Sequence, residues 1–148
     1  MITLTTWRRR KVFLTDAAYS IIERALAFHA SEDNVIIAGY VIAPDHVHIL
    51  ARPALWDLPP FIKNFKTYTG GKIKLAEDFT GGVWRRRFFT APADTPDEFA
   101  KRLRRMHNHP VKDGIVETPE DYLWSSAAAY SGKEPRIPLY IDPWGRKH

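Results

Sequence analysis

The sequence predicts an α+β fold in which helices pack on one antiparallel β-sheet. Apolar residues recur at strand spacing in some segments and at helical spacing in others, in the order strand, helix, strand, strand, helix, strand, helix. The short turn Ala43-Pro44-Asp45 joins the second and third strands, which favours a hairpin and therefore antiparallel pairing. The 148 residues suit one domain with its own core, so we expect a single domain over 1–148 with a proline-spaced tail over 131–148.

Local patterns set the predicted element boundaries. Thr95 can cap a helix, and Glu98 completes a capping box with it. Gly70-Gly71 should cost about 1 kcal/mol per glycine relative to alanine inside a helix, so we expect a kink or break there. Pro110 is expected to end or sharply weaken the last helix near His109. The predicted strands span 2–7, 35–43, 46–51 and 83–90, and the predicted helices span 15–30, 58–73 and 95–109.

The composition excludes several classes of protein. The chain has no cysteine, so it has neither a disulfide framework nor a thiolate metal site, and any metal must be bound by histidine, asparagine or carboxylate side chains. No apolar stretch approaches the roughly 20 residues that cross a bilayer. The N-terminal residues lack the order of charge and apolar residues that marks a signal peptide. We therefore expect a cytoplasmic protein with no membrane partner.

Basic residues are grouped along the chain, whose formal net charge is +5 and whose sequence pI is about 9.6. The groups lie near aromatic residues, a combination that suits single-stranded nucleic acid because phosphates attract cations and bases stack on rings. Ordinary solvated surface charge is the alternative. The chain has four such groups, within residues 8–11, 63–74, 85–87 and 101–105, and it also carries a histidine pair. This combination favours nucleic acid. The candidate contact residues are Arg8, Arg9, Arg10, Lys66, Arg85, Arg86, Arg87, Arg102 and Arg105.

The histidine pair, His46 and His48, lies in a predicted strand directly after the hairpin turn. Side chains alternate across a strand, so both imidazoles point to one face while Val47 and Ile49 point to the other. Two neutral imidazoles on one face form half of a divalent-metal site. Solvent-facing or hydrogen-bonded strand histidines would give the same pattern, so both interpretations are open at this point.

A third histidine, His109, lies at the end of the last predicted helix. Glu98, Arg102, Arg105 and His109 are spaced by four, three and four residues, so they share one polar helix face. If the opposite, apolar face of this helix packs on the sheet near the histidine pair, His109 can complete a three-nitrogen site. The alternative is a helix cap, in which His109 interacts with the helix dipole.

Four motifs, in the expected order, carry a resemblance to a known family. The run from Tyr40 to Leu50 is similar to the His-hydrophobic-His motif of the tyrosine-type HUH transposases of insertion sequences, and Trp84-Arg-Arg-Arg-Phe-Phe89 resembles their Trp-Gln-x-Arg-Phe segment. Residues 97–116 resemble the closing helix of the REP-associated tyrosine transposase branch, and residues 117–126 resemble its Pro-Glu-Asp-x-x-Trp-Ser-Ser segment. The resemblance covers about residues 2–130.

The resemblance implies a ferredoxin-like fold of the HUH-nuclease type and a role in DNA transposition. In that family, the two motif histidines and a polar residue on the last helix hold a divalent metal at the scissile phosphate of hairpin-bearing single-stranded DNA. A tyrosine four residues before the third ligand attacks that phosphate and forms a 5′-phosphotyrosine link. One helical turn places nucleophile and ligand on the same face, and the metal acts as Lewis acid and template.

This chain departs from the family pattern in the last predicted helix. Alignment on Pro110-Val111 puts His109 at the third ligand position and Arg105 at the tyrosine position. Arginine stays charged, so it binds phosphate and does not attack it. Tyr68, on the second predicted helix near basic residues, is the alternative nucleophile, although the family does not place its tyrosine there.

The resemblance thus implies a metal site made of His46, His48 and His109. A nitrogen-rich site favours Mn²⁺, Ni²⁺ or Zn²⁺ over Mg²⁺, which prefers oxygen ligands. The leading function is a transposase that binds and cleaves hairpin-bearing DNA, and the alternative is a catalytically silent, domesticated DNA-binding protein of the same fold. The His-Val-His run also suggests a histidine-triad nucleotide hydrolase, but that family needs another histidine where this chain has Leu50. Both a monomer and a homodimer are compatible with the sequence.

Overall fold

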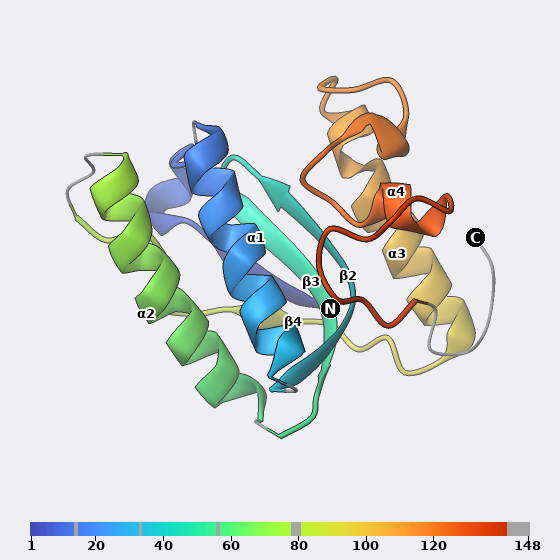
Figure 1. The fold of residues 1–148 in the computed structure, drawn as a ribbon, viewed down its shortest axis with the longest axis horizontal. Coiled ribbons are helices and arrows are strands. Elements are labelled where there is room, and N and C mark those ends of the chain that lie inside the picture. The colour runs from blue at the N-terminus through green and yellow to red at the C-terminus, as the bar shows by residue number, and fades with distance from the viewer. Residues whose placement is uncertain (14, 33, 56, 78–80, 142–148) are drawn as a thin grey trace.

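The structure, a computed structural model, describes residues 1–13, 15–32, 34–55, 57–77 and 81–141. Figure 1 shows its helices and strands coloured along the chain. In chain order they are β1 (Ile2–Thr5), the 3₁₀ helix η1 (Trp7–Arg9), α1 (Asp16–Ser31), β2 (Val35–Ala43), β3 (His46–Pro53), α2 (Leu58–Ala76), β4 (Phe89–Thr90), α3 (Pro96–Lys112), the 3₁₀ helix η2 (Pro119–Asp121) and α4 (Ala127–Tyr130).

The four strands form one antiparallel sheet in the order β2-β3-β1-β4. The β2-β3 hairpin closes where Ala43 pairs with His46. The first strand, β1, pairs with the other side of β3, so Thr5 lies opposite His46 and Thr3 lies opposite His48. The predicted α+β class, with helices packed on an antiparallel sheet, is therefore confirmed.

Helices cover both faces of the sheet, as Figure 1 shows. The helices α1 and α2 lie side by side on one face, and α3 crosses the other face near β2. Val47 and Ile49 are fully buried in the hydrophobic cluster that also contains Ile22 of α1 and Phe61 of α2. The alternation predicted for this strand therefore separates a core side from a side that carries the histidines.

Gly39 of β2 sets how closely α3 approaches the sheet. A Cβ atom added at Gly39 would lie 2.7 Å from Leu103 Cδ1, 2.9 Å from Met106 Cε and 3.2 Å from Ser126 Oγ. The first two distances are shorter than any ordinary van der Waals contact, so α3 rests directly on the backbone of β2. This close approach brings the face of α3 that carries His109 to the sheet.

Replacing Gly39 by valine should lower the free energy of unfolding by about 1–3 kcal/mol, the usual range for overpacking a filled core. Alanine should cost less, because the two nearest atoms are ends of flexible side chains that can move aside. Chemical denaturation of the two variants measures both values. A valine variant as stable as the wild type would show that α3 is not held by this contact.

The second helix, α2, runs unbroken from Leu58 to Ala76, so the predicted break at Gly70-Gly71 is wrong. Phe65, Thr69 and Ile73 lie on the buried face of this helix and are completely inaccessible to solvent. Burial of the two large apolar side chains, Phe65 and Ile73, contributes several kcal/mol, about twice the cost of two glycines in a helix. Tertiary packing therefore outweighs local propensity at this point.

The third helix, α3, continues past Pro110 to Lys112, so its predicted end near His109 is also wrong. Proline removes one backbone donor, but less than one turn of helix follows it, and its ring is buried. The N–H of Asp113 donates to the carbonyl oxygen of His109 at 3.0 Å, which completes the helix. Asp113 therefore lies one turn beyond His109 on the same side of α3.

The strand predicted over 83–90 is reduced to β4 and an isolated bridge at Trp84. Lys66 of α2 accounts for the interruption. Its Nζ donates to the carbonyl oxygen of Arg85 at 2.6 Å and to that of the next residue at 3.2 Å. Because these carbonyl groups point to the ammonium, they do not pair with a neighbouring strand.

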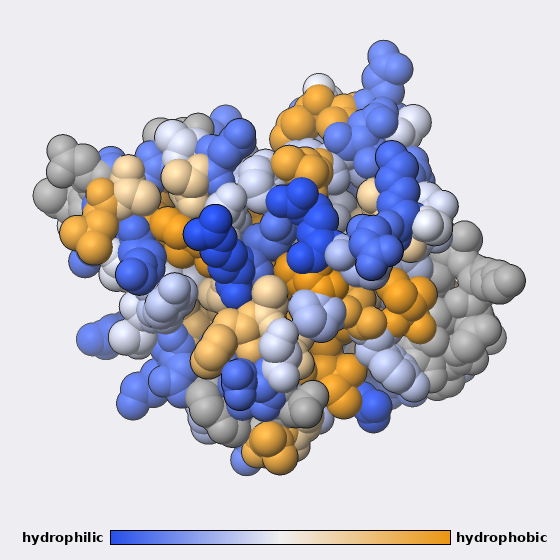
Figure 2. Space-filling view, in the orientation of Figure 1, coloured by the Kyte–Doolittle hydropathy of each residue, from blue (hydrophilic) through white to orange (hydrophobic). Residues whose placement is uncertain are grey.

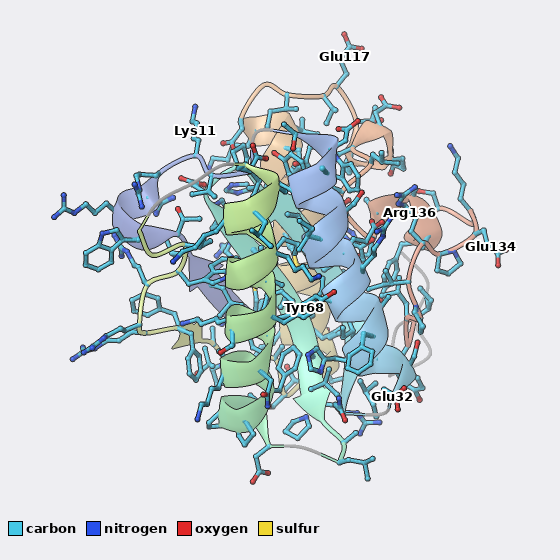
Figure 3. The ribbon with its side chains drawn as sticks, turned by 60° about the vertical axis from the view of Figure 1, so that its left-hand side comes forward. Lys11, Glu32, Tyr68, Glu117, Glu134 and Arg136 are labelled. Atoms are coloured by element: carbon cyan, nitrogen blue, oxygen red, sulfur yellow. The ribbon has the colours of Figure 1, made fainter. Side chains whose placement is uncertain are left out.

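The described part of the predicted tail, residues 131–141, packs against β2 and α1. The N–H of Tyr140 donates to the carbonyl oxygen of Ile37 at 2.8 Å. Arg136 forms an ion pair with Glu23 of α1 at 2.9 Å, and Figure 3 shows Arg136 beside that helix. Residues 142–148 of the predicted tail lie outside the described residues.

Hydrophilic residues cover most of the face drawn in Figure 2, and hydrophobic residues show between them in scattered groups. The main hydrophobic cluster is buried between the sheet and its helices. In the part of the chain that the structure describes, no helix combines the length and apolar character needed to cross a bilayer.

Candidate metal centre and nucleic-acid interface

Three histidines from two elements meet on the α3 face of the sheet. His46 and His48 occupy same-face positions on β3, and His109 comes from the last turns of α3. The ring centroids are 4.6 Å apart for His46 and His48, 4.8 Å for His46 and His109, and 5.8 Å for His48 and His109. One nitrogen from each ring lies within 4.8 Å of the other two. The structure therefore brings together the three residues that the sequence indicated as ligands.

Each of the three imidazoles is held by a polar neighbour through one ring nitrogen. Metal-binding histidines commonly use their second nitrogen in this way, because the hydrogen bond fixes the ring and its tautomer. The nitrogens left for a metal are Nε2 of His46 and His48 and Nδ1 of His109. The three contacts are Asp45 Oδ1 to His46 Nδ1 at 2.7 Å, Thr3 Oγ1 to His48 Nδ1 at 2.9 Å, and Asp113 Oδ2 to His109 Nε2 at 3.2 Å.

The environment of His46 Nε2 fits a metal ligand. This nitrogen is buried and has no hydrogen-bond partner among the described residues. Most buried polar atoms are hydrogen-bonded, because leaving one unpaired costs about 1–3 kcal/mol. An imidazole nitrogen that is buried, unpaired and oriented by Asp45 is suited to bind a divalent ion.

Burial keeps two of the three rings neutral. The pKa of His48 is lowered to about 3, first because burial disfavours the charged form and then because His46 and His109 would add positive charge nearby. Burial also lowers the pKa of His46, although the neighbouring Asp45 acts in the opposite direction. A neutral imidazole keeps the lone pair that binds a metal, so both rings are in the binding form at neutral pH.

Asp45 connects the histidines to the basic run at residues 8–11. Burial alone would raise the pKa of Asp45, but the hydrogen bond and charge of His46, together with Arg9, lower it overall. Arg9 Nη2 lies 3.4 Å from Asp45 Oδ2. Arg9 is largely exposed, so this ion pair contributes little to stability. The ion pair does fix a position: Asp45 contacts both Arg9 and His46, so only the Asp45 side chain lies between the Arg9 guanidinium and the histidines.

Two of the basic clusters lie next to each other. The N–H of Trp7 in η1 donates to the carbonyl oxygen of Val83 at 2.8 Å, and the N–H of Arg85 donates to that of Thr5 at 2.9 Å. These bonds join the N-terminal segment that contains η1 to the segment that carries Arg85, Arg86 and Arg87. The exposed cations on this joint surface include Arg8, Arg9, Arg10, Arg86 and Arg87.

Lys66 differs from these exposed arginines. Its ammonium donates to the carbonyl oxygens of Arg85, Arg86 and, at 3.5 Å, Arg87. Burial lowers the pKa of Lys66. Because the ammonium of Lys66 already binds these backbone carbonyl groups, its role is to hold the segment of Arg85–Arg87 in place and not to contact DNA directly.

The polar face of α3 carries two arginines that precede His109 along the helix. Arg105 is exposed and lies one turn before His109, so the two side chains share a helix face. Arg102 lies on the same face, and its Nε donates to the carbonyl oxygen of Pro92 at 2.7 Å. The position at which the family resemblance places a nucleophile is therefore occupied by an exposed arginine one helical turn before His109.

Tyr68 does not lie near the histidines. It is 52% exposed on α2, which packs on the sheet face opposite to α3. Figure 3 shows Tyr68 on α2 in front of the sheet, with α3 behind it. The sheet separates the Tyr68 hydroxyl from the three histidines of the same chain, so the geometry gives no support to this alternative nucleophile. The hydroxyls of Tyr122 and Tyr130 donate to backbone carbonyl groups of β2.

Sequence reasoning did not identify Thr3 and Asp113 as part of this centre. Asp113 follows His109 by four residues, a spacing that brings side chains together on a helix. The spacing of His109 and Asp113 indicates their contact only if the helix continues past His109, whereas the sequence predicts that Pro110 ends or weakens it. Thr3 could be found only from the register of β1 against β3, which no local pattern reveals.

Comparison with known proteins assigns the family. A sequence model of the family described as "Transposase IS200 like" matches residues 1–102. This chain belongs to the IS200-like transposase family. The matched region of this transposase contains His46, His48 and the Trp84–Phe89 motif, and it ends before Arg105 and His109.

Two further matches lie in the REP-associated branch. A relative in Haemophilus influenzae, described as "Putative REP-associated tyrosine transposase", is 26% identical over 161 residues, which cover 97% of this chain and 85% of the relative. A solved structure, described as the REP-associated tyrosine transposase bound to a REP hairpin, matches with a TM-score of 0.68 at 20% identity. That match covers 98% of this chain and 83% of the other. The resemblance drawn from the motifs is confirmed, and the fold is shared along nearly the whole chain.

Proposed function

We propose that this transposase binds hairpin-bearing single-stranded DNA and a divalent metal at the centre formed by His46, His48 and His109. The observation that carries the proposal is the convergence of three imidazoles, each oriented through its other nitrogen, in a chain of the IS200-like family. The family reaction that accompanies such a centre is strand cleavage and transfer through a 5′-phosphotyrosine. Arg105 at the tyrosine position favours a second function, DNA binding at the same surface without cleavage.

Two independent observations support DNA as the partner. The solved structure that shares this fold is described as bound to a REP hairpin. In this chain, exposed arginines of η1 and of the segment before β4 adjoin each other, and Arg9 contacts Asp45 beside the histidines. Cations placed next to a metal centre would neutralise the phosphates that flank the bound one.

The side chains of the centre suit chemistry on a phosphodiester. A divalent ion bound there would supply Lewis-acid stabilisation of the charge that develops on the phosphate oxygens. Arg105 would bind the same phosphate, because a guanidinium pairs with two of its oxygens at once. Arg105 has no oxygen with which to attack phosphorus. We therefore infer that this chain binds and orients the phosphate with weak or absent strand transfer.

Affinity for a DNA hairpin with a single-stranded flank should fall steeply as salt is added. The logarithm of affinity changes by about −0.7 per neutralised phosphate for each unit of log salt concentration on single strands. Replacing Arg85, Arg86 and Arg87 together by glutamine should reduce the magnitude of that slope by about 1–2, because Arg86 and Arg87 are exposed. Fluorescence anisotropy at several salt concentrations measures the slope.

A control variant tests whether position matters or only net charge. Replacing Arg24, Lys74 and Lys133 by glutamine removes the same charge from α1, α2 and the C-terminal segment. Its salt slope should match the wild type. Equal slopes for both triple variants would remove the arginine segment from the interface, and wild-type affinity that does not change with salt would contradict DNA binding itself.

A further inference from the structure

Two consecutive phenylalanines point to opposite faces of the sheet. Phe88 packs against the hydrophobic core, and the Lys66 ammonium lies 6.0 Å from its ring centroid. Phe89, the first residue of β4, is 61% exposed. Strand alternation explains this difference, because neighbouring side chains emerge on opposite sides. An exposed phenylalanine is common on protein surfaces, so its position decides whether it matters.

The sheet register places Phe89 in one row with the histidine cluster. Phe89 pairs with Thr3 across β4 and β1, and Thr3 pairs with His48 across β1 and β3. Directly paired residues share a face, and the Thr3 hydroxyl contacts His48 Nδ1. Adjacent strands lie about 4.8 Å apart, so the backbone of Phe89 is about 10 Å from that of His48.

Arginines are carried by the two segments next to this row of side chains, the one that precedes β4 and the polar face of α3. Arg85, Arg86 and Arg87 precede β4, and Arg102 and Arg105 lie on the face of α3 that carries His109. The helices α1 and α2 pack on the other face of the sheet, and α3 packs on β2, so Phe89 keeps its ring open to solvent. Proteins hold single-stranded nucleic acid with exposed aromatic rings and with arginines carried by neighbouring segments.

We propose that Phe89 is a stacking platform for one base of single-stranded DNA whose neighbouring phosphate lies at the histidine cluster. This inference rests on the proposed function and adds the residue that holds the strand beside the centre. The ring binds the base face, which every base presents, so the platform fixes the position of a nucleotide and does not read its identity. The arginines bind the phosphates on either side.

Substitution of Phe89 by alanine should weaken binding of a hairpin with a single-stranded oligothymidine flank by about 5- to 150-fold. Tryptophan should retain affinity, whereas leucine should lose it, because leucine keeps an apolar surface but has no ring. The salt slope should stay at the wild-type value, since Phe89 neutralises no phosphate. The midpoint of thermal unfolding should also stay close to that of the wild type, because the side chain is 61% exposed. Phe28→Ala, an exposed aromatic on α1, is the matched control.

A scan of abasic sites through the oligothymidine flank tests the contact directly. In the wild type, one abasic position should weaken binding more than the others. In Phe89→Ala that position should cost nothing further, because base and ring form a single contact. Equal affinity of Phe89→Ala and the wild type, a leucine variant that binds as well as the wild type, or no coupling to any position would each overturn the platform while leaving the proposed function intact. Absence of DNA binding by the wild type would overturn both.

Discussion

Substitution of Arg105 by tyrosine should give this protein a covalent link to DNA that the wild type does not form. The position lies one turn before His109, on the same face of α3, and its side chain is exposed. A tyrosine oxygen held there would form a bond to phosphorus while the bond to the 3′ oxygen breaks, leaving a 5′-phosphotyrosine and a free 3′-hydroxyl. Positioning the nucleophile is a large part of such catalysis. Denaturing gel electrophoresis of protein incubated with labelled hairpin DNA and Mn²⁺ measures the adduct.

Three companion variants separate the causes of any adduct. Arg105→Phe has a ring of the same size without the hydroxyl, so it should give no adduct. Adding His48→Ala to Arg105→Tyr should abolish the adduct, because the phosphate would no longer be held at the histidines. A wild-type adduct that disappears in Tyr68→Phe would overturn our assignment and make Tyr68 the nucleophile. Slow hydrolysis by water would cleave the strand without any adduct in the wild type.

Several parts of the fold could be predicted because their signals are local. The hairpin follows from the turn at residues 43–45, and Thr95 accepts the predicted hydrogen bond from the N–H of Glu98 at 3.2 Å. The wrong predictions came from contacts between distant segments. The burial of Phe65 and Ile73 on either side of Gly70-Gly71 keeps α2 helical across these glycines. Lys66 binds carbonyl groups that a continuous fourth strand would have used for pairing. Tertiary packing changed the outcome where the local preference was only about 1–2 kcal/mol.

The same distinction applies to the metal centre. His46 and His48 could be placed on one face from strand alternation alone, and His109 from helical spacing together with the family resemblance. The contact of Asp113 with His109 depends on α3 continuing through Pro110, which the sequence argued against. The approach of His109 to the strand histidines depends on Gly39, where α3 touches the backbone of β2. Both are consequences of packing, so local reasoning yielded the ligands without the residues that position them.

Removal of any one of the three imidazoles should sharply weaken metal binding. We expect His46→Ala, His48→Ala and His109→Ala each to lower the affinity for Mn²⁺ or Zn²⁺ by at least the ~100-fold that loss of an orienting partner can cost. The reason is that three nitrogens within 4.8 Å of one another can bind a single ion, whereas two form only a weak site. Isothermal titration calorimetry of the metal-free protein measures the affinities. Mg²⁺ should bind more weakly than Mn²⁺, Ni²⁺ or Zn²⁺, because it prefers oxygen ligands.

The contact between His109 and Asp113 fits two roles for His109, a metal ligand or a cap of α3. The two roles differ in what Asp113 does. If Asp113 orients His109 for a metal, Asp113→Asn should reduce metal affinity by about 10- to 100-fold, while Glu117→Gln, an exposed carboxylate just beyond the helix, should leave it unchanged. If His109 is only a cap, His109→Ala and Asp113→Asn should lower stability to thermal unfolding and leave metal affinity at the wild-type value. Equal or tighter binding of Mg²⁺ than of Mn²⁺ would likewise contradict a three-nitrogen site.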